Sequence, residues 1–181
     1  MNSIIPSTIT TPNLVVRDAD IRDAEALKAI CRSWSDKLLL EGEVFEGGYI
    51  EKCIGEGDLP PIENASRRCY QLKAICSGAD AGVVGFLDVY HGYPNPSTIW
   101  ISIFVVDTAL QQHGVGGEVI EAIAAEGRKL GYTSLGIGVH LKNWKGLRFW
   151  HKNGFDRISR IGGDREYGAD KFAVMFLERA I

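Results

Sequence analysis

The sequence has none of the features that mark a membrane-spanning, secreted or nucleic-acid-binding protein. No apolar run approaches the roughly 20 residues that a membrane helix needs. The first residues, "MNSIIPSTITTPN", lack the basic start and the apolar core of a secretion signal. The 20 basic and 23 acidic residues leave a net charge of −3 and form no run of one sign. We therefore expect neither nucleic acid nor a membrane surface as a partner.

Cysteine is scarce, and its spacing argues against two kinds of site. The sequence holds no CxxC pair and no cysteine beside a histidine, which is unlike a zinc site or a disulfide framework. The four cysteines are Cys31, Cys53, Cys69 and Cys76. We expect them to be buried thiols in a reducing compartment, and we expect a cytoplasmic protein without a bound metal.

The apolar content is sufficient for one domain. The chain has 181 residues, of which 45% are hydrophobic, and this is enough for a single sizeable core and rather little for two. The sequence shows no internal repeat and no low-complexity segment. We expect a flexible N-terminal segment at residues 1–12, followed by a single domain at residues 13–181.

Strand-like and helix-like patterns alternate along this domain. The expected strands are 13–19, 68–76, 82–91, 98–106, 133–141, 155–161 and 171–178, and the expected helices are 20–34, 48–54, 114–130 and 143–153. The turn "GYPNP" joins two of the strands and favours an antiparallel meander. The pattern predicts an α/β domain of the α+β kind, with a mixed, largely antiparallel sheet and helices on both faces.

A glycine cluster, "QQHGVGG" at residues 111–117, stands between an apolar strand and a helix. Glycine costs about 1 kcal/mol relative to alanine inside a helix, so three of them need a reason. Successive backbone N–H groups before a helix N-terminus are suited to hold a pyrophosphate, and glycines let it come close. Glu118 and Val119 follow the cluster, which excludes a P-loop and the GxGxxG fingerprint. The alternative interpretation is a glycine-rich helix start that serves close packing only.

An acidic residue interrupts an apolar strand at Asp88. The period of two in a strand places Asp88 on the same face as Phe86 and Tyr90. Asp88 is a candidate general base. Tyr90 is a second candidate catalytic residue, which would line the side of the site that binds the acceptor. The alternative for Asp88 is a solvated strand position or a partner for a buried donor.

Two blocks of the sequence resemble the GNAT superfamily of acyl-CoA-dependent N-acyltransferases. The family signature is an arginine or glutamine, two residues, a glycine, one residue, and then glycine or alanine. Gln111 to Gly116, "QQHGVG", matches it. The second block is an asparagine that begins a short helix with an aromatic pair before Gly-Phe, as in "NWKGLRFWHKNGF" from Asn143 to Phe155. The resemblance is clear over residues 82–155.

The resemblance implies a V-shaped opening between a central strand and the next parallel strand, with acetyl-CoA bound as co-substrate. The pyrophosphate would lie on the glycine loop, and backbone groups of two strand residues would pair with the pantetheine arm. Asn143 would hydrogen-bond the same arm, although helix capping explains an asparagine there equally well. The implied cofactor-binding residues are Phe104, Val106, Gln111, Gln112, His113, Gly114, Val115, Gly116, Gly117 and Asn143.

The aromatic pair of the second block departs from the family pattern. Many members place a tyrosine at its second position, where it protonates the leaving thiolate. Here the pair is Phe149 and Trp150, and the indole N–H of tryptophan donates a hydrogen bond but is no practical acid. Trp150 is therefore a candidate for a hydrogen bond to the sulfur or for a pocket wall, with core packing as the alternative.

These observations lead to two hypotheses of different classes. The first is an N-acetyltransferase that transfers an acetyl group to a primary amine of a small-molecule or peptidyl acceptor by direct attack. The second is a non-catalytic CoA-binding or regulatory module of the same fold, which the replacement at Trp150 motivates. A different acyl-CoA is a third and weaker hypothesis. A homodimer through the last strands is one possible assembly.

Overall fold

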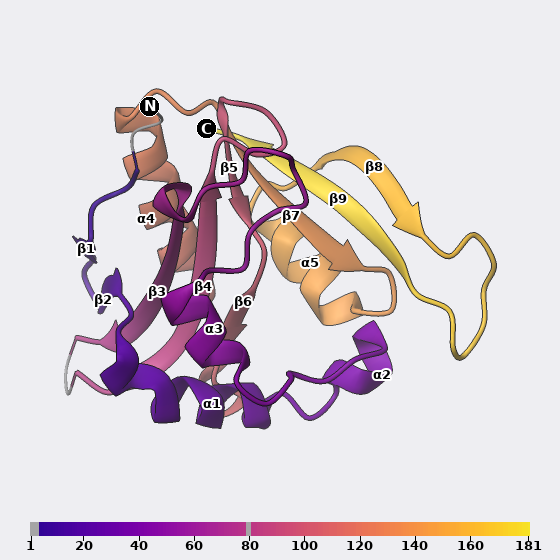
Figure 1. Ribbon diagram of the computed structural model, residues 1–181, viewed down its shortest axis with the longest axis horizontal. Helices are drawn as coiled ribbons and strands as arrows, with labels where there is room; N and C mark the ends of the chain where they lie inside the picture. The colour runs from indigo at the N-terminus through magenta and orange to yellow at the C-terminus, as the bar shows by residue number, and fades with distance from the viewer. Residues whose placement is uncertain (1–3, 79–80) are drawn as a thin grey trace.

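The computed structural model describes residues 4–78 and 81–181, which form one mixed sheet with helices on both faces (Figure 1). The sheet order is β1-β2-β3-β4-β5-β7-β9-β8, and β6 pairs with β4 off this path. The strands are β1 (Thr8–Thr10), β2 (Leu14–Asp18), β3 (Tyr70–Ser77), β4 (Val83–His91), β5 (Thr98–Ile101), β6 (Phe104–Val106), β7 (Ser134–His140), β8 (Arg157–Gly163) and β9 (Ala173–Ala180). The pair β5 and β7 is parallel, and the other pairs of the described sheet are antiparallel. The largely antiparallel sheet expected from the sequence is thus confirmed.

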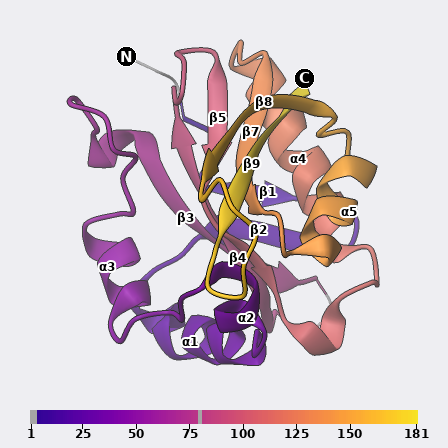
Figure 2. The ribbon, with the colours of Figure 1, turned by 90° about the vertical axis from the view of Figure 1, so that its right-hand side faces the viewer.

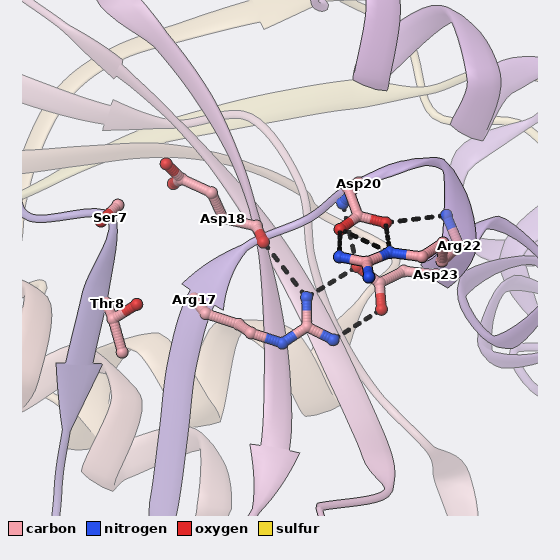
Figure 3. A pocket seen from close by; sticks show the side chains of 7 residues that line it. All are labelled: Ser7, Thr8, Arg17, Asp18, Asp20, Arg22 and Asp23. Carbon is pink, nitrogen blue, oxygen red and sulfur yellow. Dashed lines mark hydrogen bonds and ion pairs between the residues drawn. The ribbon is translucent and has the colours of Figure 1, made fainter.

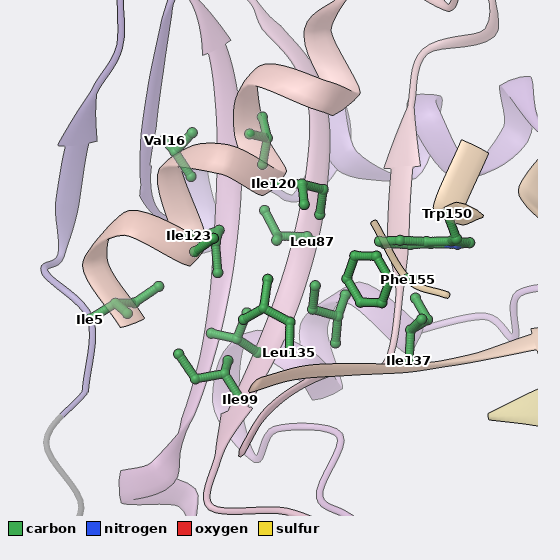
Figure 4. Packing of buried hydrophobic residues seen from close by; sticks show 14 of the residues in the cluster. Ile5, Val16, Leu87, Ile99, Ile120, Ile123, Leu135, Ile137, Trp150 and Phe155 are labelled. Atoms are coloured by element: carbon green, nitrogen blue, oxygen red, sulfur yellow. The ribbon is translucent and has the colours of Figure 1, made fainter. Parts of the chain in front are cut away.

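The helices divide between the two faces of the sheet (Figures 1 and 2). They are α1 (Ala24–Ser33), α2 (Lys37–Glu41), α3 (Tyr49–Gly55), α4 (Val115–Lys129) and α5 (Trp144–Lys152), with short 3₁₀ turns η1 (Ile21–Asp23), η2 (Arg67–Cys69) and η3 (Thr108–Leu110). Helices α4 and α5 pack on one face, where Ile120 and Ile123 meet Leu87 and Leu135 (Figure 4). Helices α1 and α3 pack on the other face, over Leu72, Phe86 and Tyr90.

Helix α4 shows how local sequence positions the site. Its buried residues recur at intervals of three and four, as an amphipathic helix requires: Val119, Ile120, Ile123, Ala124 and Gly127. Gly114 precedes the helix with a φ of 88°, and Gly131 follows it with a φ of 86°. Both angles are left-handed, which glycine adopts without the steric cost that other residues meet.

Residues 1–3 of the segment expected to be flexible, 1–12, lie outside the described residues, and several of residues 4–12 make long-range contacts. Strand β1 pairs with β2, and the side chain of Ile5 is only 1% exposed in the main core. The amide of Ile5 donates to Nε2 of His91 at 3.2 Å. Glu118, in the first turn of α4, accepts hydrogen bonds from Thr11 and Asn13. Packed structure therefore begins before residue 13, because partners more than 80 residues away in the chain hold it.

Two further expectations concern cysteine and membranes. Each cysteine is a free thiol, and Cys31, Cys53 and Cys76 are buried as expected, whereas Cys69 is only half-buried. No helix within the described ranges is long and apolar enough to cross a membrane.

Candidate active site

A β-bulge interrupts the strand that the sequence predicted as continuous from 98 to 106. Tyr90 of β4 pairs with Trp100, but Leu87 pairs with Phe104 rather than with residue 103. One extra residue therefore lies on the side of β5 and β6, at Ser102 and Ile103, opposite Asp88. A bulge bends the strand that contains it, and here it separates β5 from β6.

Asp88 holds this bulge through its side chain. Its Oδ1 accepts hydrogen bonds from the amides of Ser102 at 2.9 Å and Ile103 at 3.0 Å. The Asp88 amide donates to the Ile103 carbonyl at 3.1 Å. The residue is fully buried, and burial raises the pKa of its carboxyl to about 7 although the hydrogen bond from Ile103 lowers it. Its other oxygen, Oδ2, is buried and has no hydrogen-bond partner among the described residues.

Beyond the bulge the sheet opens. Strand β5 pairs with β7 from Thr98 to Ile101, whereas β6 pairs only with β4 in the described sheet. The Asp107 amide donates to the carbonyl of Val84 in β4. Because successive residues of a strand alternate in hydrogen-bond direction, the backbone groups of Phe104 and Val106 face away from β4. A pairing with the pantetheine arm requires this direction, and the pairing itself stays a prediction.

The glycine loop follows this open strand after the short turn η3. Gln112 has a φ of 68° and Gly114 begins α4 in the left-handed region, so the chain turns sharply into the helix. The first intrahelical hydrogen bond runs from Glu118 to the Gly114 carbonyl at 3.1 Å. Ahead of it, the amides of the first helical turn have no protein acceptor in the described part of the chain. Such amides, with the positive end of the helix dipole, attract an anion.

The three glycines of the loop serve two different purposes. Gly114 has open space around its Cα, and its left-handed φ is the reason for glycine there. At Gly116, a Cβ atom would lie 2.7 Å from the ring of Phe149 in α5. At Gly117, a Cβ atom would lie 3.2 Å from Oδ1 of Asn153. Packing thus accounts for two of the glycines, and the free amides of the helix start remain available to a ligand.

The side chain of Asn143 caps α5. Its Oδ1 accepts a hydrogen bond from the Gly146 amide at 2.8 Å, so the capping interpretation of this residue is confirmed. The pantetheine contact stays a prediction. The other expected cofactor-binding residues lie on the loop before α4. Gln111 is exposed and donates a hydrogen bond to the Val106 carbonyl at 3.1 Å. Gln112 and His113 are exposed beside the start of the helix, whose first residue is Val115.

Two of the expected catalytic residues are buried among other groups. Trp150 is 5% exposed, and its ring packs against Phe104 at 5.9 Å and Phe155 at 4.8 Å between centroids. The hydroxyl of Tyr90 accepts a hydrogen bond from the Ser66 amide at 2.9 Å. Tyr90 is 3% exposed and so anchors the segment before β3. The roles expected for both in catalysis stay predictions.

A cavity of about 300 Å³ opens on the face of α1 and α3. Its lining includes Ser102, so the cavity reaches the bulge. The other lining residues are Asp58, Leu59, Pro60, Pro61, Tyr93, Trp100, Arg160 and Phe176. Sequence reasoning missed this set, because its members come from two loops, the bulge and three strands with no shared local pattern. Only the alternation of Trp100 with Ser102 along one strand was visible as a signal.

A larger polar hollow of about 570 Å³ lies at the opposite edge of the sheet, beside β1, β2 and η1 (Figure 3). Its charges neutralise one another: Arg17 forms two hydrogen bonds to Asp23, and Arg22 pairs with Asp20. It is remote in the sheet order from the bulge and from the glycine loop. We therefore assign the candidate site to the opening beyond β5 and to the smaller cavity.

A known protein family resembles this chain over much of its length. The family model described as the acetyltransferase (GNAT) family matches residues 43–155, which is more than half of the chain. No curated protein matches the sequence significantly.

Solved structures share the fold at low sequence identity. The acetyl transferase of Salmonella typhimurium that modifies the N-terminal serine of 50S ribosomal subunit protein L7/L12 has a TM-score of 0.74 and 16% identity, covering 96% of this chain and 99% of that one. An acetyltransferase (GNAT family) from Bacillus anthracis has a TM-score of 0.72 and 16% identity, covering 96% and 98%. An acetyltransferase from Thermus thermophilus has a TM-score of 0.70 and 20% identity, covering 96% and 99%. With the family model matched across the bulge, the glycine loop and the Asn143 block, this protein belongs to the acetyltransferase (GNAT) family.

Proposed function

We propose that this protein transfers an acetyl group from acetyl-CoA to a primary amine of a small-molecule acceptor. One observation carries the proposal: within the described residues β6 has no second strand partner beside β4, and η3 connects it to the free amides at the start of α4. An unpaired strand edge suits an extended amide-bearing chain, and a helix N-terminus suits a pyrophosphate. In acetyl-CoA the pantetheine arm is joined to the pyrophosphate, so one molecule would contact β6 with its arm and the start of α4 with its phosphates.

Residues on both sides of the opening would hold the co-substrate. The backbone groups of Phe104 and Val106 would pair with the pantetheine amides, and the Asn143 side-chain amide would donate to the same arm. The loop from Gln111 to Gly117 would hold the phosphates. Acetyl-CoA supplies a thioester carbonyl that a neutral amine can attack. The four free thiols further support a reducing compartment such as the cytoplasm.

The chemistry asks little of the protein beyond positioning. The amine nitrogen forms a bond to the carbonyl carbon, the bond from carbon to sulfur breaks, and the proton that the acylated nitrogen releases passes through water to the departing thiolate. The amine first loses its own proton to a base at the site. Asp88 is enclosed and already holds two amides, so we assign it a positioning role in the bulge rather than the role of base. Trp150 would form a wall behind Phe104.

Titration with acetyl-CoA tests the binding half of this proposal. Gln112 is exposed in a left-handed conformation that aspartate and asparagine tolerate better than most residues. Gln112→Asp places a negative charge at the phosphate seat, and Gln112→Asn is the neutral control of nearly the same shape. We expect the aspartate variant to bind acetyl-CoA at least tenfold more weakly, measured by calorimetry, and the asparagine variant to bind within a factor of three. Equal affinities would contradict a phosphate seat at this loop.

Thiol release with a panel of primary amines tests the transfer half. A turnover with any amine, absent without the amine, is the expected result. Tight acetyl-CoA binding without turnover would instead favour a non-catalytic CoA-binding module. The observation behind that second candidate is the burial of Trp150 at the position where many family members have a tyrosine.

A further inference from the structure

Two opposite charges line the cavity next to the bulge without neutralising each other. Within residues 4–78 and 81–181, neither Asp58 nor Arg160 forms an ion pair, although both line the same space of about 300 Å³. The polar hollow at the other edge differs, because its arginines are paired with its aspartates. The cavity therefore offers a ligand both a carboxylate and a guanidinium.

The wall between these charges is aromatic. Trp100 stacks on Phe176 with ring centroids 5.9 Å apart, and Tyr93 meets the edge of Trp100 at 5.3 Å. A Cβ atom on Gly136 of β7 would lie 2.8 Å from the Trp100 ring, so a glycine is needed beneath it. The guanidinium of Arg160 lies 4.1 Å from the centroid of the Phe176 ring. Such a surface accepts the apolar part of a ligand and favours cationic groups near its ring faces.

The cavity has one end at the bulge and another at β8. Ser102 marks the bulge end, because its amide donates to Asp88. Asp58 lines the same cavity from the loop that follows α3. Arg160 belongs to β8, beyond β7 and β9 in the sheet order, and marks the other end. Strands are about 4.8 Å apart, so β5 and β9 are separated by roughly 10 Å.

We propose that this cavity binds the acceptor as a zwitterion, with its amine between Asp58 and Ser102 and its anionic group on Arg160. The inference rests on the proposed acetyl transfer and names its substrate class: a primary amine joined to a carboxylate by an apolar spacer of several bonds. A carboxylate fits the planar fork of an arginine in two parallel hydrogen bonds. An ammonium fits beside a carboxylate and aromatic rings.

Binding of a homologous series of small compounds tests this inference. The probes are the ω-amino acids from 3-aminopropanoate to 6-aminohexanoate, each compared with the alkylamine of equal carbon number. Affinities are measured by saturation-transfer NMR with the protein saturated with CoA, which permits no acetylation. We expect at least one amino acid to bind tenfold more tightly than its alkylamine. Equal or weaker binding of every amino acid, or no binding of any probe, overturns the inference.

Variants at exposed arginines identify the group responsible. Arg160→Met removes the charge at the cavity, and Arg165→Met removes one from the exposed loop outside it. We expect the ratio of amino-acid to alkylamine affinity to fall at least fivefold in Arg160→Met and to stay within a factor of two in Arg165→Met. Arg160→Lys retains the charge without the planar fork and should give an intermediate ratio. A ratio that survives in Arg160→Met, or is lost in both methionine variants, overturns the inference.

Failure of the substrate class and failure of acetyl transfer can be told apart. If acetyl-CoA binds and simple alkylamines are acetylated as well as the amino acids, only the zwitterion inference is wrong. If acetyl-CoA does not bind, the proposed function is wrong, and the NMR comparison without CoA still decides whether the cavity takes zwitterions.

Discussion

The carboxylate of Asp88 accepts a hydrogen bond from the backbone amide of Ser102, 14 residues later in the chain. The same oxygen also accepts from the next amide, that of Ile103. A side chain of β4 thereby satisfies two partly buried backbone donors that the bulge would otherwise leave without an acceptor. This contact turns β6 away from β7 and so creates the opening on which the proposed function depends.

Removal of this acceptor should weaken the whole fold. Asp88→Leu keeps the number of side-chain heavy atoms but leaves two partly buried amides without an acceptor, at about 1–3 kcal/mol each. We expect a loss of roughly 2–5 kcal/mol in the free energy of unfolding, measured with urea, and weaker acetyl-CoA binding. Asp88→Asn keeps one oxygen in place and should retain most of the stability. Equal losses in the two variants would show that the hydrogen bonds are not what holds the bulge.

The same residue should make stability depend on pH. Burial raises the pKa of Asp88 from 3.8 to about 7 in the folded protein. The folded state therefore holds a proton that the unfolded state releases, so this stabilisation is complete below about pH 4 and is lost as the pH rises through 7. We expect the unfolding free energy of the wild type to fall relative to Asp88→Asn between pH 4.5 and 7.5.

His91 provides the opposite slope in both proteins. Burial lowers its pKa to about 4, so its neutral form gains stability as the pH rises. Because this effect is common to wild type and Asp88→Asn, it cancels in their difference. Parallel stability curves for the two proteins would exclude titration of Asp88 in this range.

The close contact at Gly116 should appear as a coupling with Phe149. Gly116→Ala forces the new methyl group against the ring, and overpacking of this kind costs about 1–3 kcal/mol. Phe149→Leu frees that space. In the Phe149→Leu background, alanine at 116 should be neutral or stabilising, since alanine favours a helix. A double-mutant cycle by urea unfolding measures the coupling, and additive effects would count against the packing role of this glycine.

Variants of Asn143 should separate helix capping from cofactor binding. Asn143→Asp keeps an oxygen for the Gly146 amide, whereas Asn143→Ala loses the cap at about 0.5–2 kcal/mol. The aspartate lacks the side-chain N–H that the pantetheine arm would accept. We therefore expect near wild-type unfolding temperature but at least fivefold weaker acetyl-CoA binding for Asn143→Asp. Unchanged affinity would leave capping as the sole role of Asn143.

Two neighbouring isoleucines test the N-terminal packing. Ile5 is 1% exposed and Ile4 is 42% exposed. Ile5→Ala should cost about 2–4 kcal/mol because it leaves a cavity in the main core, while Ile4→Ala should cost less than about 1 kcal/mol. Thermal unfolding of both variants measures the difference. Similar small effects would instead support the flexible segment that the sequence suggested.

Local patterns in the sequence were enough to predict the order of the main elements, and the phosphate seat that they suggest stays a prediction. Helical periodicity predicted α4, and the glycines predicted the sharp turn at its start. Asn143 predicted the start of α5. The GNAT family followed from the same two blocks. These features depend on residues within a few positions of one another, so periodicity, caps and turns express them directly.

Contacts between distant residues decided the rest. The break in the strand at Ser102 depends on the Asp88 carboxylate in the neighbouring strand, so the apolar run alone predicted one continuous strand. Packing of the N-terminal residues depends on the hydrogen bond from the Ile5 amide to the His91 ring. The charged cavity exists only because folding brings Asp58 and Arg160, from a loop and an edge strand, to the same face of the sheet. No local pattern contains such pairings, because they arise from sheet register and packing rather than from the preferences of neighbouring residues.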